Sequence, residues 1–216
     1  MDDDLQLLRR DLDIFHRMSM EAEEFLKSDL ERWPMASGDM PQLTLGGLLM
    51  RRRRLGLLQA RLDKGEQERF GAAVERVRLL LGSQVVRFEL KGHRELHQRL
   101  GEWIGHLRNW TKIGGVKAEN YAEAADIRVV ISEVVSRLQR KPYQIDPRVL
   151  SELAQVDRRL QASWSPSSFV WPQLWQPAYD EQSFWWLYGQ PKFREDDHSM
   201  FGRFQPPTFN PPVPRT

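Results

Sequence analysis

The most concentrated chemistry in the sequence is a run of four arginines at residues 51–54. A guanidinium group is always charged and binds phosphate or carboxylate through paired hydrogen bonds. Arg51, Arg52, Arg53 and Arg54 are therefore candidate contacts to phosphate, including the backbone of a nucleic acid.

The charges of the neighbouring segments favour an intramolecular role for this run. Residues 1–31 hold ten acidic and four basic residues, whereas residues 42–64 hold six basic residues and one acidic residue. We expect the arginines mainly to complement an acidic first helix, with Arg53 and Arg54 pointing away from the apolar stripe of their own helix.

Two histidines, His93 and His97, are four residues apart and so share one helical face, as a pair of metal ligands would. The zinc-protease motif needs a glutamate directly after the first histidine, but the nearest one here is Glu95. A metal site like that of the helical-bundle DinB-type hydrolases would need a third histidine from another helix, for which only His16 is suitable. The sequence therefore predicts no metal and no other cofactor.

An arginine separated from a following histidine by four to six intervening residues resembles the motif of HEPN ribonucleases. With 25 arginines in 216 residues, a few such pairs are expected by chance, and in two of the three pairs an apolar residue follows the arginine. The pairs are Arg10 with His16, Arg87 with His93, and Arg99 with His106. We do not expect ribonuclease activity.

No other catalytic constellation is present in the sequence. There is no cysteine, no glycine-rich phosphate loop and no Gly-x-Ser-x-Gly elbow. Carboxylates are abundant, but no pair is singled out for acid–base work. The sequence nominates no catalytic residue and favours a non-enzymatic protein.

The last 53 residues, 164–216, differ in composition from residues 1–163. They hold nine of the 13 prolines and 13 of the 22 aromatic residues. Aromatic side chains dominate binding hot spots, and an exposed segment this rich in them would aggregate. We expect an extended arm that docks on its own bundle or on a partner protein. The candidate partner-binding residues are Trp171, Trp175, Trp185, Trp186, Tyr188, Phe201 and Phe204.

Apolar residues recur every three or four positions through residues 1–163, which predicts an all-α bundle of about five helices. The first helix covers residues 3–32, and Asp39 with Gln42 resembles a capping box that would start the second. Residues 66–110 form either one long central helix or two in line, broken near Gly82 or Gly92.

Two further helices complete the predicted bundle. One follows the glycine pair at residues 114–115, and the other starts at Asp146-Pro147, an N-cap followed by proline at the first helical position. We find no strand pattern before Trp164.

The overall composition bears on where in the cell the protein acts. The net charge is +2, no apolar run approaches the ~20 residues needed to span a bilayer, and the sequence begins with three aspartates rather than a basic signal segment. We expect a cytoplasmic interaction or assembly subunit that associates with itself or with a protein partner. An arginine-rich protein that binds nucleic acid is the alternative.

Overall fold

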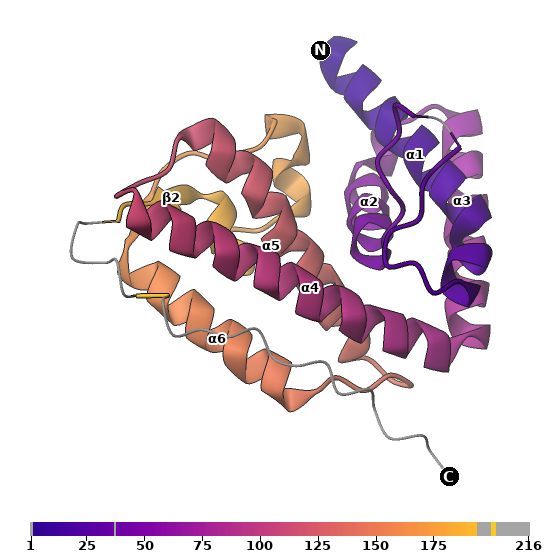
Figure 1. Cartoon of the computed structure of the whole chain (residues 1–216). Helices are drawn as coiled ribbons and strands as arrows, with labels where there is room; N and C mark the ends of the chain where they lie inside the picture. Colours follow the sequence, from indigo (N-terminus) through magenta and orange to yellow (C-terminus); the bar gives the residue numbers. More distant parts are fainter. Residues whose placement is uncertain (1, 37, 194–199, 202–216) are drawn as a thin grey trace.

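A computed structural model describes residues 2–36, 38–193 and 200–201, and the fold is all-α (Figure 1). In these ranges the α-helices are α1 Asp2–Lys27, α2 Leu45–Leu58, α3 Lys64–Ser83, α4 Val85–Lys112, α5 Ala118–Leu138 and α6 Pro147–Ala162. Three short 3₁₀ helices and two short strands complete the described structure: η1 Gln59–Arg61, η2 Gln173–Ala178, η3 Trp185–Leu187, β1 Trp164–Pro166 and β2 Gly189–Pro191.

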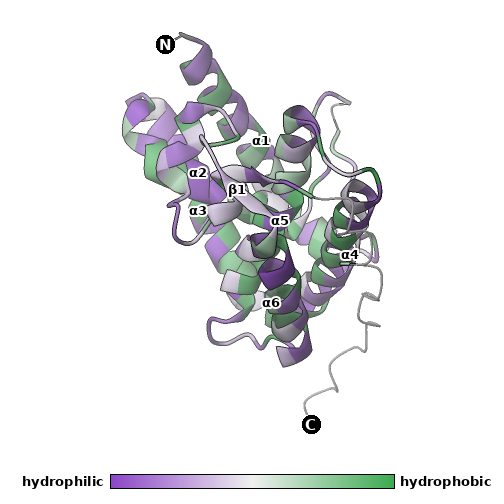
Figure 2. Cartoon of the chain, turned by 90° about the vertical axis from the view of Figure 1, so that its left-hand side faces the viewer, coloured by the Kyte–Doolittle hydropathy of each residue, from purple (hydrophilic) through white to green (hydrophobic). Residues whose placement is uncertain are grey.

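The helices form two groups that α2 and α5 hold together. Helix α1 packs on α2 and α3, while α4 packs on α5 and α6. Helix α2 also packs on α5 and thereby joins the groups, which lie side by side in Figure 1. Hydrophilic and hydrophobic residues alternate along each helix in Figure 2, as expected of amphipathic helices that share one core.

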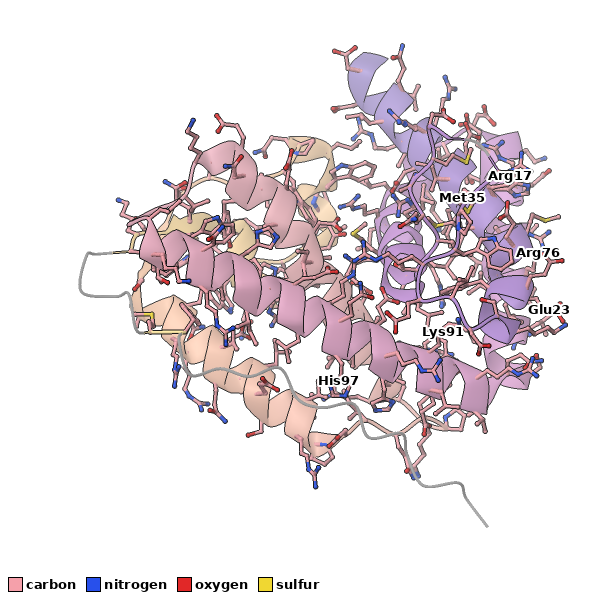
Figure 3. The ribbon with its side chains drawn as sticks, viewed as in Figure 1. Arg17, Glu23, Met35, Arg76, Lys91 and His97 are labelled. Atoms are coloured by element: carbon pink, nitrogen blue, oxygen red, sulfur yellow. The ribbon has the colours of Figure 1, made fainter. Side chains whose placement is uncertain are left out.

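Partly buried polar contacts between helices reinforce this packing. Lys91 of α4 donates to the carbonyl oxygens of Ser28 (3.0 Å) and Leu30 (2.6 Å), directly beyond the C-terminus of α1. Arg76 of α3 donates to Ser19 Oγ of α1 (2.8 Å). Figure 3 labels Arg76 and Lys91 on their helices. Both cations therefore tie α1 to the helices that cover it.

The stretch 66–110 is divided into two helices, one of the two alternatives that the sequence left open. The break lies at Gln84, just after Gly82, where the backbone leaves helical geometry (φ −115°, ψ 40°). Figure 1 shows α4 running away from α3 at a steep angle. Because of this turn, α3 lies mainly on α1, whereas α4 lies mainly on α5 and also contacts α1, α2 and α6.

The expected start of the second helix near Asp39 is wrong, because α2 begins at Leu45. Thr44 Oγ1 accepts from Gly47 N (3.1 Å), and the carboxylate of Glu95 on α4 accepts from Leu45 N (2.8 Å) and Gly46 N (3.2 Å). Burial raises the pKa of Glu95. The N-terminus of α2 is thus capped by a residue about fifty positions away along the chain.

Gly46 allows α2 to approach α5 this closely. A Cβ added at Gly46 would lie 2.3 Å from Val130 Cγ1 and 3.0 Å from the Val130 carbonyl oxygen. Any larger residue would push the start of α2 away from α5.

Residues 164–193 lie against the helices rather than apart from them. Strands β1 and β2 pair antiparallel, η2 packs on α2, and η3 packs on α5. Buried aromatic residues of this segment belong to the same hydrophobic core as the helices. Residues 194–199 and 202–216, and with them Phe204, lie outside the described residues. A domain division near Ser163 remains a prediction.

No helix among the described residues has both the length and the apolar character needed to cross a membrane.

Candidate anion-binding site

Three of the four arginines in the run at residues 51–54 have partners within the chain. Arg51 Nε lies 3.2 Å from Asp11 Oδ1 on α1, as the acidic first helix led us to expect. Arg53 pairs with Glu133 of α5 and lies 5.0 Å from the ring centre of Phe184. The two carboxylates that pair with Arg51 and Arg53, those of Asp11 and Glu133, are both buried.

Arg54 occupies a cage of aromatic rings from residues 171–179. Its Nε donates to the hydroxyl of Tyr179 (2.9 Å). Its guanidinium carbon lies 4.7 Å and 4.9 Å from the ring centres of Trp171 and Trp175. At these distances a desolvated cation is attracted to the ring faces.

The expectation that Arg53 and Arg54 point away from the core into solvent is wrong. Arg54 is buried, and Arg53 is covered in part by Phe184 and Glu133. The helical period did place these residues opposite the apolar stripe. However, η2 packs on α2 from that side, so the helix is buried on two faces.

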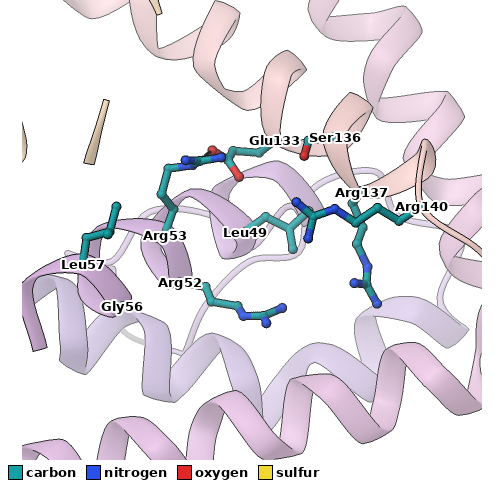
Figure 4. Close-up of a pocket in the computed structure, with 9 residues that line it drawn as sticks. All are labelled: Leu49, Arg52, Arg53, Gly56, Leu57, Glu133, Ser136, Arg137 and Arg140. Carbon is teal, nitrogen blue, oxygen red and sulfur yellow. Dashed lines mark hydrogen bonds and ion pairs between the residues drawn. The ribbon is translucent and has the colours of Figure 1, made fainter. Parts of the chain in front are cut away.

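Arg52 is the member of the run that faces other arginines. Together with Arg137 and Arg140, from the C-terminal end of α5, it lines a pocket of about 270 Å³. Figure 4 shows these three side chains around one hollow, with Arg53 directed to Glu133 at its edge. We call the hollow that Arg52, Arg137 and Arg140 surround the arginine pocket.

The electrostatics of the arginine pocket favour an anion. The lining includes four arginines and one carboxylate, that of Glu133, which already pairs with Arg53. The pKa of Arg52 is lowered, first by burial and then by repulsion from Arg137 and Arg140. The partial negative charge at the C-terminus of α5 explains in part why cations are tolerated there.

Arg137 is held in place by contacts with Tyr143. Its guanidinium carbon lies 5.0 Å from the ring centre of Tyr143, and Nη2 is 3.4 Å from the Tyr143 hydroxyl. That hydroxyl donates to the carbonyl oxygen of Leu81 (2.7 Å), which fixes the ring. Within the described residues, Nε of Arg137 is buried and has no hydrogen-bond partner.

In the histidine pair on α4, His93 makes hydrogen bonds within the fold. His93 is buried, its Nδ1 lies 2.8 Å from the Glu89 carbonyl oxygen, and its Nε2 accepts from Asp146 N (3.1 Å). Both ring nitrogens of His93 are therefore engaged, Nδ1 within α4 and Nε2 at the N-cap of α6. His97, labelled in Figure 3, lies one turn further along α4. No group of three or more residues in the described ranges has the composition and spacing of a metal site.

The three arginine–histidine pairs are not brought together as a single site. Arg87 is exposed whereas His93 is buried. Arg99 pairs with Glu95 and Glu102, while His106 packs against Trp110 at 5.5 Å between ring centres. Arg10 lines a pocket between α1 and α2, and His16 is not among the residues of that lining.

The aromatic residues nominated for partner binding make contacts within the chain. Trp171 Nε1 donates to the Ala122 carbonyl oxygen (2.8 Å), and Trp186 lies beneath the guanidinium of Arg128 at 3.9 Å. Trp185 packs edge-on against Trp164, and the carbonyl oxygen of Phe201 accepts from Arg108 Nε (2.8 Å). The Tyr188 hydroxyl donates to the Tyr179 carbonyl oxygen (2.5 Å), while Trp175 forms part of the cage around Arg54. A role for these residues in binding a partner remains a prediction.

Sequence reasoning missed Arg137 and Arg140, which lie more than eighty positions from Arg52. A basic last turn after a long apolar helix is the only local signal, and it is common in helices that bind nothing.

Comparison of the chain with protein-family models, with curated proteins and with solved structures found no significant match.

Proposed function

We propose that the protein is a non-enzymatic binding subunit whose arginine pocket recognises a phosphorylated side chain of a partner protein. The observation that carries the proposal is the convergence of Arg52, Arg137 and Arg140 around one hollow, with the nearest carboxylate already paired to Arg53. Clusters of arginine are the usual means of reading phosphorylated motifs, because several guanidinium groups share a doubly charged anion.

The size and rim of the pocket favour a side chain over a nucleic acid. A volume of about 270 Å³ suits one phosphate group and its linker, whereas nucleic acid binding uses a series of phosphate contacts along a surface. The remaining arginines of the run do not supply such a series, since Arg51, Arg53 and Arg54 have internal partners. Leu57 on the rim is 57% exposed and offers an apolar contact to a residue next to the phosphate.

The aromatic segment at residues 164–193 supports this role indirectly, because it packs against the helix that carries Arg52. Its cage holds Arg54 on the same helix that presents Arg52, so docking of the segment within the chain stabilises α2. We include in the proposal that the protein acts in the cytoplasm as a subunit of an assembly. The cysteine-free sequence agrees with a reducing compartment.

An array of peptides with phosphoserine at a fixed position in randomised surroundings tests the proposal. The full chain should bind the phosphorylated array in preference to the same array after phosphatase treatment. The variant with Arg52→Glu and Arg140→Glu should lose at least tenfold in signal. Arg87→Glu on the exposed face of α4 is the matched control for charge reversal and should bind like the wild type.

Nucleic acid is tested in the same experiment with random single-stranded DNA and RNA. A steep fall of affinity with salt that depends on Arg52 and Arg140 would favour the alternative of a nucleic-acid-binding protein. Equal binding of the two peptide arrays, or no loss in the double variant, would overturn the proposal.

A further inference from the structure

Helices α1 and α3 lie at one edge of the molecule in Figure 1, and a groove of about 410 Å³ lies between them. Every residue of its lining belongs to one of these two helices. We call the exposed surface on both sides of this groove the α1–α3 edge. The arginine pocket is formed elsewhere, by α2 and residues 133–140, so the inference below does not rest on the proposed function.

Two large apolar side chains of the groove lining are exposed. Met20 of α1 is 56% exposed and Leu79 of α3 is 57% exposed, and they line the groove together with the buried Leu80. A single exposed apolar residue is normal on a protein surface, whereas several that line one groove are typical of an interaction surface.

The α1–α3 edge is basic just before the groove. Burial and then repulsion from Arg69, Arg76 and Arg17 lower the pKa of His16, which shows that cations gather there. Arg69 pairs with Asp13 of α1 (2.7 Å). Arg17 and Arg76 therefore carry the excess of positive charge at this end.

The α1–α3 edge is acidic at the other end of the groove. Glu23 and Glu24 of α1 are exposed, and Lys27 pairs with Glu23 (2.5 Å). Figure 3 shows Arg17, Arg76 and Glu23 in this order along the edge. The charge thus changes sign from one end of the groove to the other.

The two helices of the edge run in the same direction. Successive contacts join Arg9 to Glu66 and then Asp13 to Arg69. A two-fold axis across the edge would reverse both helices in a second copy and so place its acidic end on the basic end of the first. A face with this order of charges complements itself, which favours a second copy over a partner of one charge.

We infer that the α1–α3 edge joins two copies of this chain in a dimer whose two-fold axis passes near Met20. Arg17 lies about one turn before Met20 and Glu24 about one turn after it, so Arg17 of each copy meets Glu24 of the other. Met20 of each copy enters the groove of the other beside Leu79. The unbranched side chain of methionine adapts to an irregular groove of this kind.

The α1–α3 edge has the area that a specific dimer needs. Helix α1 has 26 residues and α3 has 20, so they share a length of ~30 Å, and two helices are ~20 Å wide. Such a face covers ~600 Å² on each copy, and the ~1,200 Å² from both copies is the lower end of specific interfaces. We therefore expect a dimer that dissociates on dilution.

Analytical ultracentrifugation of the full chain over about a hundredfold range of concentration tests the inference, because a dimer of this kind responds to mass action. Leu79→Glu should raise the dissociation constant of the dimer about tenfold or more, since it places an unpaired carboxylate in the groove. Ile113→Glu is the matched control, because Ile113 is 72% exposed at the end of α4 far from α3. It should leave dimerisation unchanged, and circular dichroism should show both variants folded.

A charge exchange distinguishes this dimer from other modes of association. Arg17→Glu and Glu24→Arg should each weaken the dimer about threefold, as expected of an exposed ion pair. The variant that carries both changes should dimerise like the wild type, because the exchanged charges meet again across the two-fold axis. A chain that stays monomeric at every concentration, a dimer insensitive to Leu79→Glu, or no recovery in the double variant would overturn the inference.

Discussion

Arg52 and Arg54 are two positions apart on α2, yet the protein treats their charges in opposite ways. Arg54 is buried among Trp171, Trp175 and Tyr179, which satisfy it by a hydrogen bond and by ring faces. Arg52 instead faces Arg137 and Arg140, which repel it. A cation that the fold has satisfied contributes to stability, whereas a group of cations that the fold leaves unsatisfied can attract a ligand. The difference teaches that the role of a charge run depends on what packs against each member.

The largest expected effect is on Arg54, whose removal should destabilise the fold. Arg54→Ala should lower the free energy of unfolding by about 3 kcal/mol, because a charge-assisted hydrogen bond and desolvated cation–π contacts are lost together. Urea denaturation followed by tryptophan fluorescence measures this. Arg87→Ala, which is exposed on α4, should change the free energy of unfolding by less than about 0.5 kcal/mol. Equal effects in the two variants would show that the cage does not hold Arg54.

The next effect concerns the packing of α2 against α5. This packing positions both Arg52 and Arg54. Gly46→Ala should cost about 2 kcal/mol of stability, because the new methyl group would overlap Val130. It should also weaken phosphopeptide binding, since α2 would move relative to Arg137 and Arg140. Gly71→Ala on α3 is the control: its Cβ meets nothing within 4 Å, so it should stabilise the protein by up to ~1 kcal/mol. If both substitutions have the same sign, the close approach at Gly46 is not required.

A smaller effect is expected when Arg53 loses its carboxylate partner, Glu133, and becomes available to bind an anion. Glu133→Gln removes the carboxylate from the pocket lining and should increase affinity for inorganic sulfate about fivefold, corresponding to ~1 kcal/mol for one unit charge nearby. Equilibrium dialysis measures the change. Glu75→Gln, which removes an exposed carboxylate on α3, should leave sulfate binding unaltered. A fall in affinity in Glu133→Gln would mean that Glu133 organises the pocket rather than opposing the anion.

The same residue should make anion binding depend on pH. Burial raises the pKa of Glu133, so the carboxylate becomes neutral at a higher pH than an ordinary glutamate does. As the pH falls through this raised pKa, sulfate affinity of the wild type should increase towards that of Glu133→Gln, whose affinity should stay more nearly constant. Sulfate keeps its charge over this range, so the change reports on the protein. Parallel pH profiles for the two proteins would contradict this expectation.

The smallest effect has the opposite sign to that of Arg54. Arg140→Gln should raise the free energy of unfolding by about 0.5 kcal/mol at low salt, because it relieves repulsion within the arginine pocket. The gain should disappear near 1 M salt, where screening acts over ~3 Å. Thermal unfolding at two salt concentrations measures it. A loss of stability in Arg140→Gln would show that the pocket is a structural element instead of an unsatisfied cluster.

The positions of helices were predictable where local chemistry alone sets them. Asp146-Pro147 predicted the start of α6, and Asp146 does accept from Arg148 N (2.9 Å). The apolar period predicted an all-α fold, because each amphipathic helix must bury its own stripe. Neither inference required knowledge of a distant residue.

The start of α2 and the break at Gln84 were decided by tertiary contacts. Glu95 caps α2 from another helix, so Thr44 rather than Asp39 precedes its first turn. The sequence offered Gly82 and Gly92 as possible break points without choosing between them and one continuous helix, and the division at Gln84 lets α3 lie mainly on α1 and α4 mainly on α5. Packing outweighs local signals of this kind, which are worth only ~1 kcal/mol each.

The candidate site shows the same division between sequence and tertiary structure. The sequence by itself determined that four consecutive arginines lie on one helix, beside an acidic first helix, and that an aromatic segment follows residue 163. Only the tertiary structure decided that Arg54 enters an aromatic cage while Arg52 meets Arg137 and Arg140. The physical reason is that hydrophobic burial fixes how α2, α5 and residues 173–187 pack, and this packing then determines which charges meet a partner.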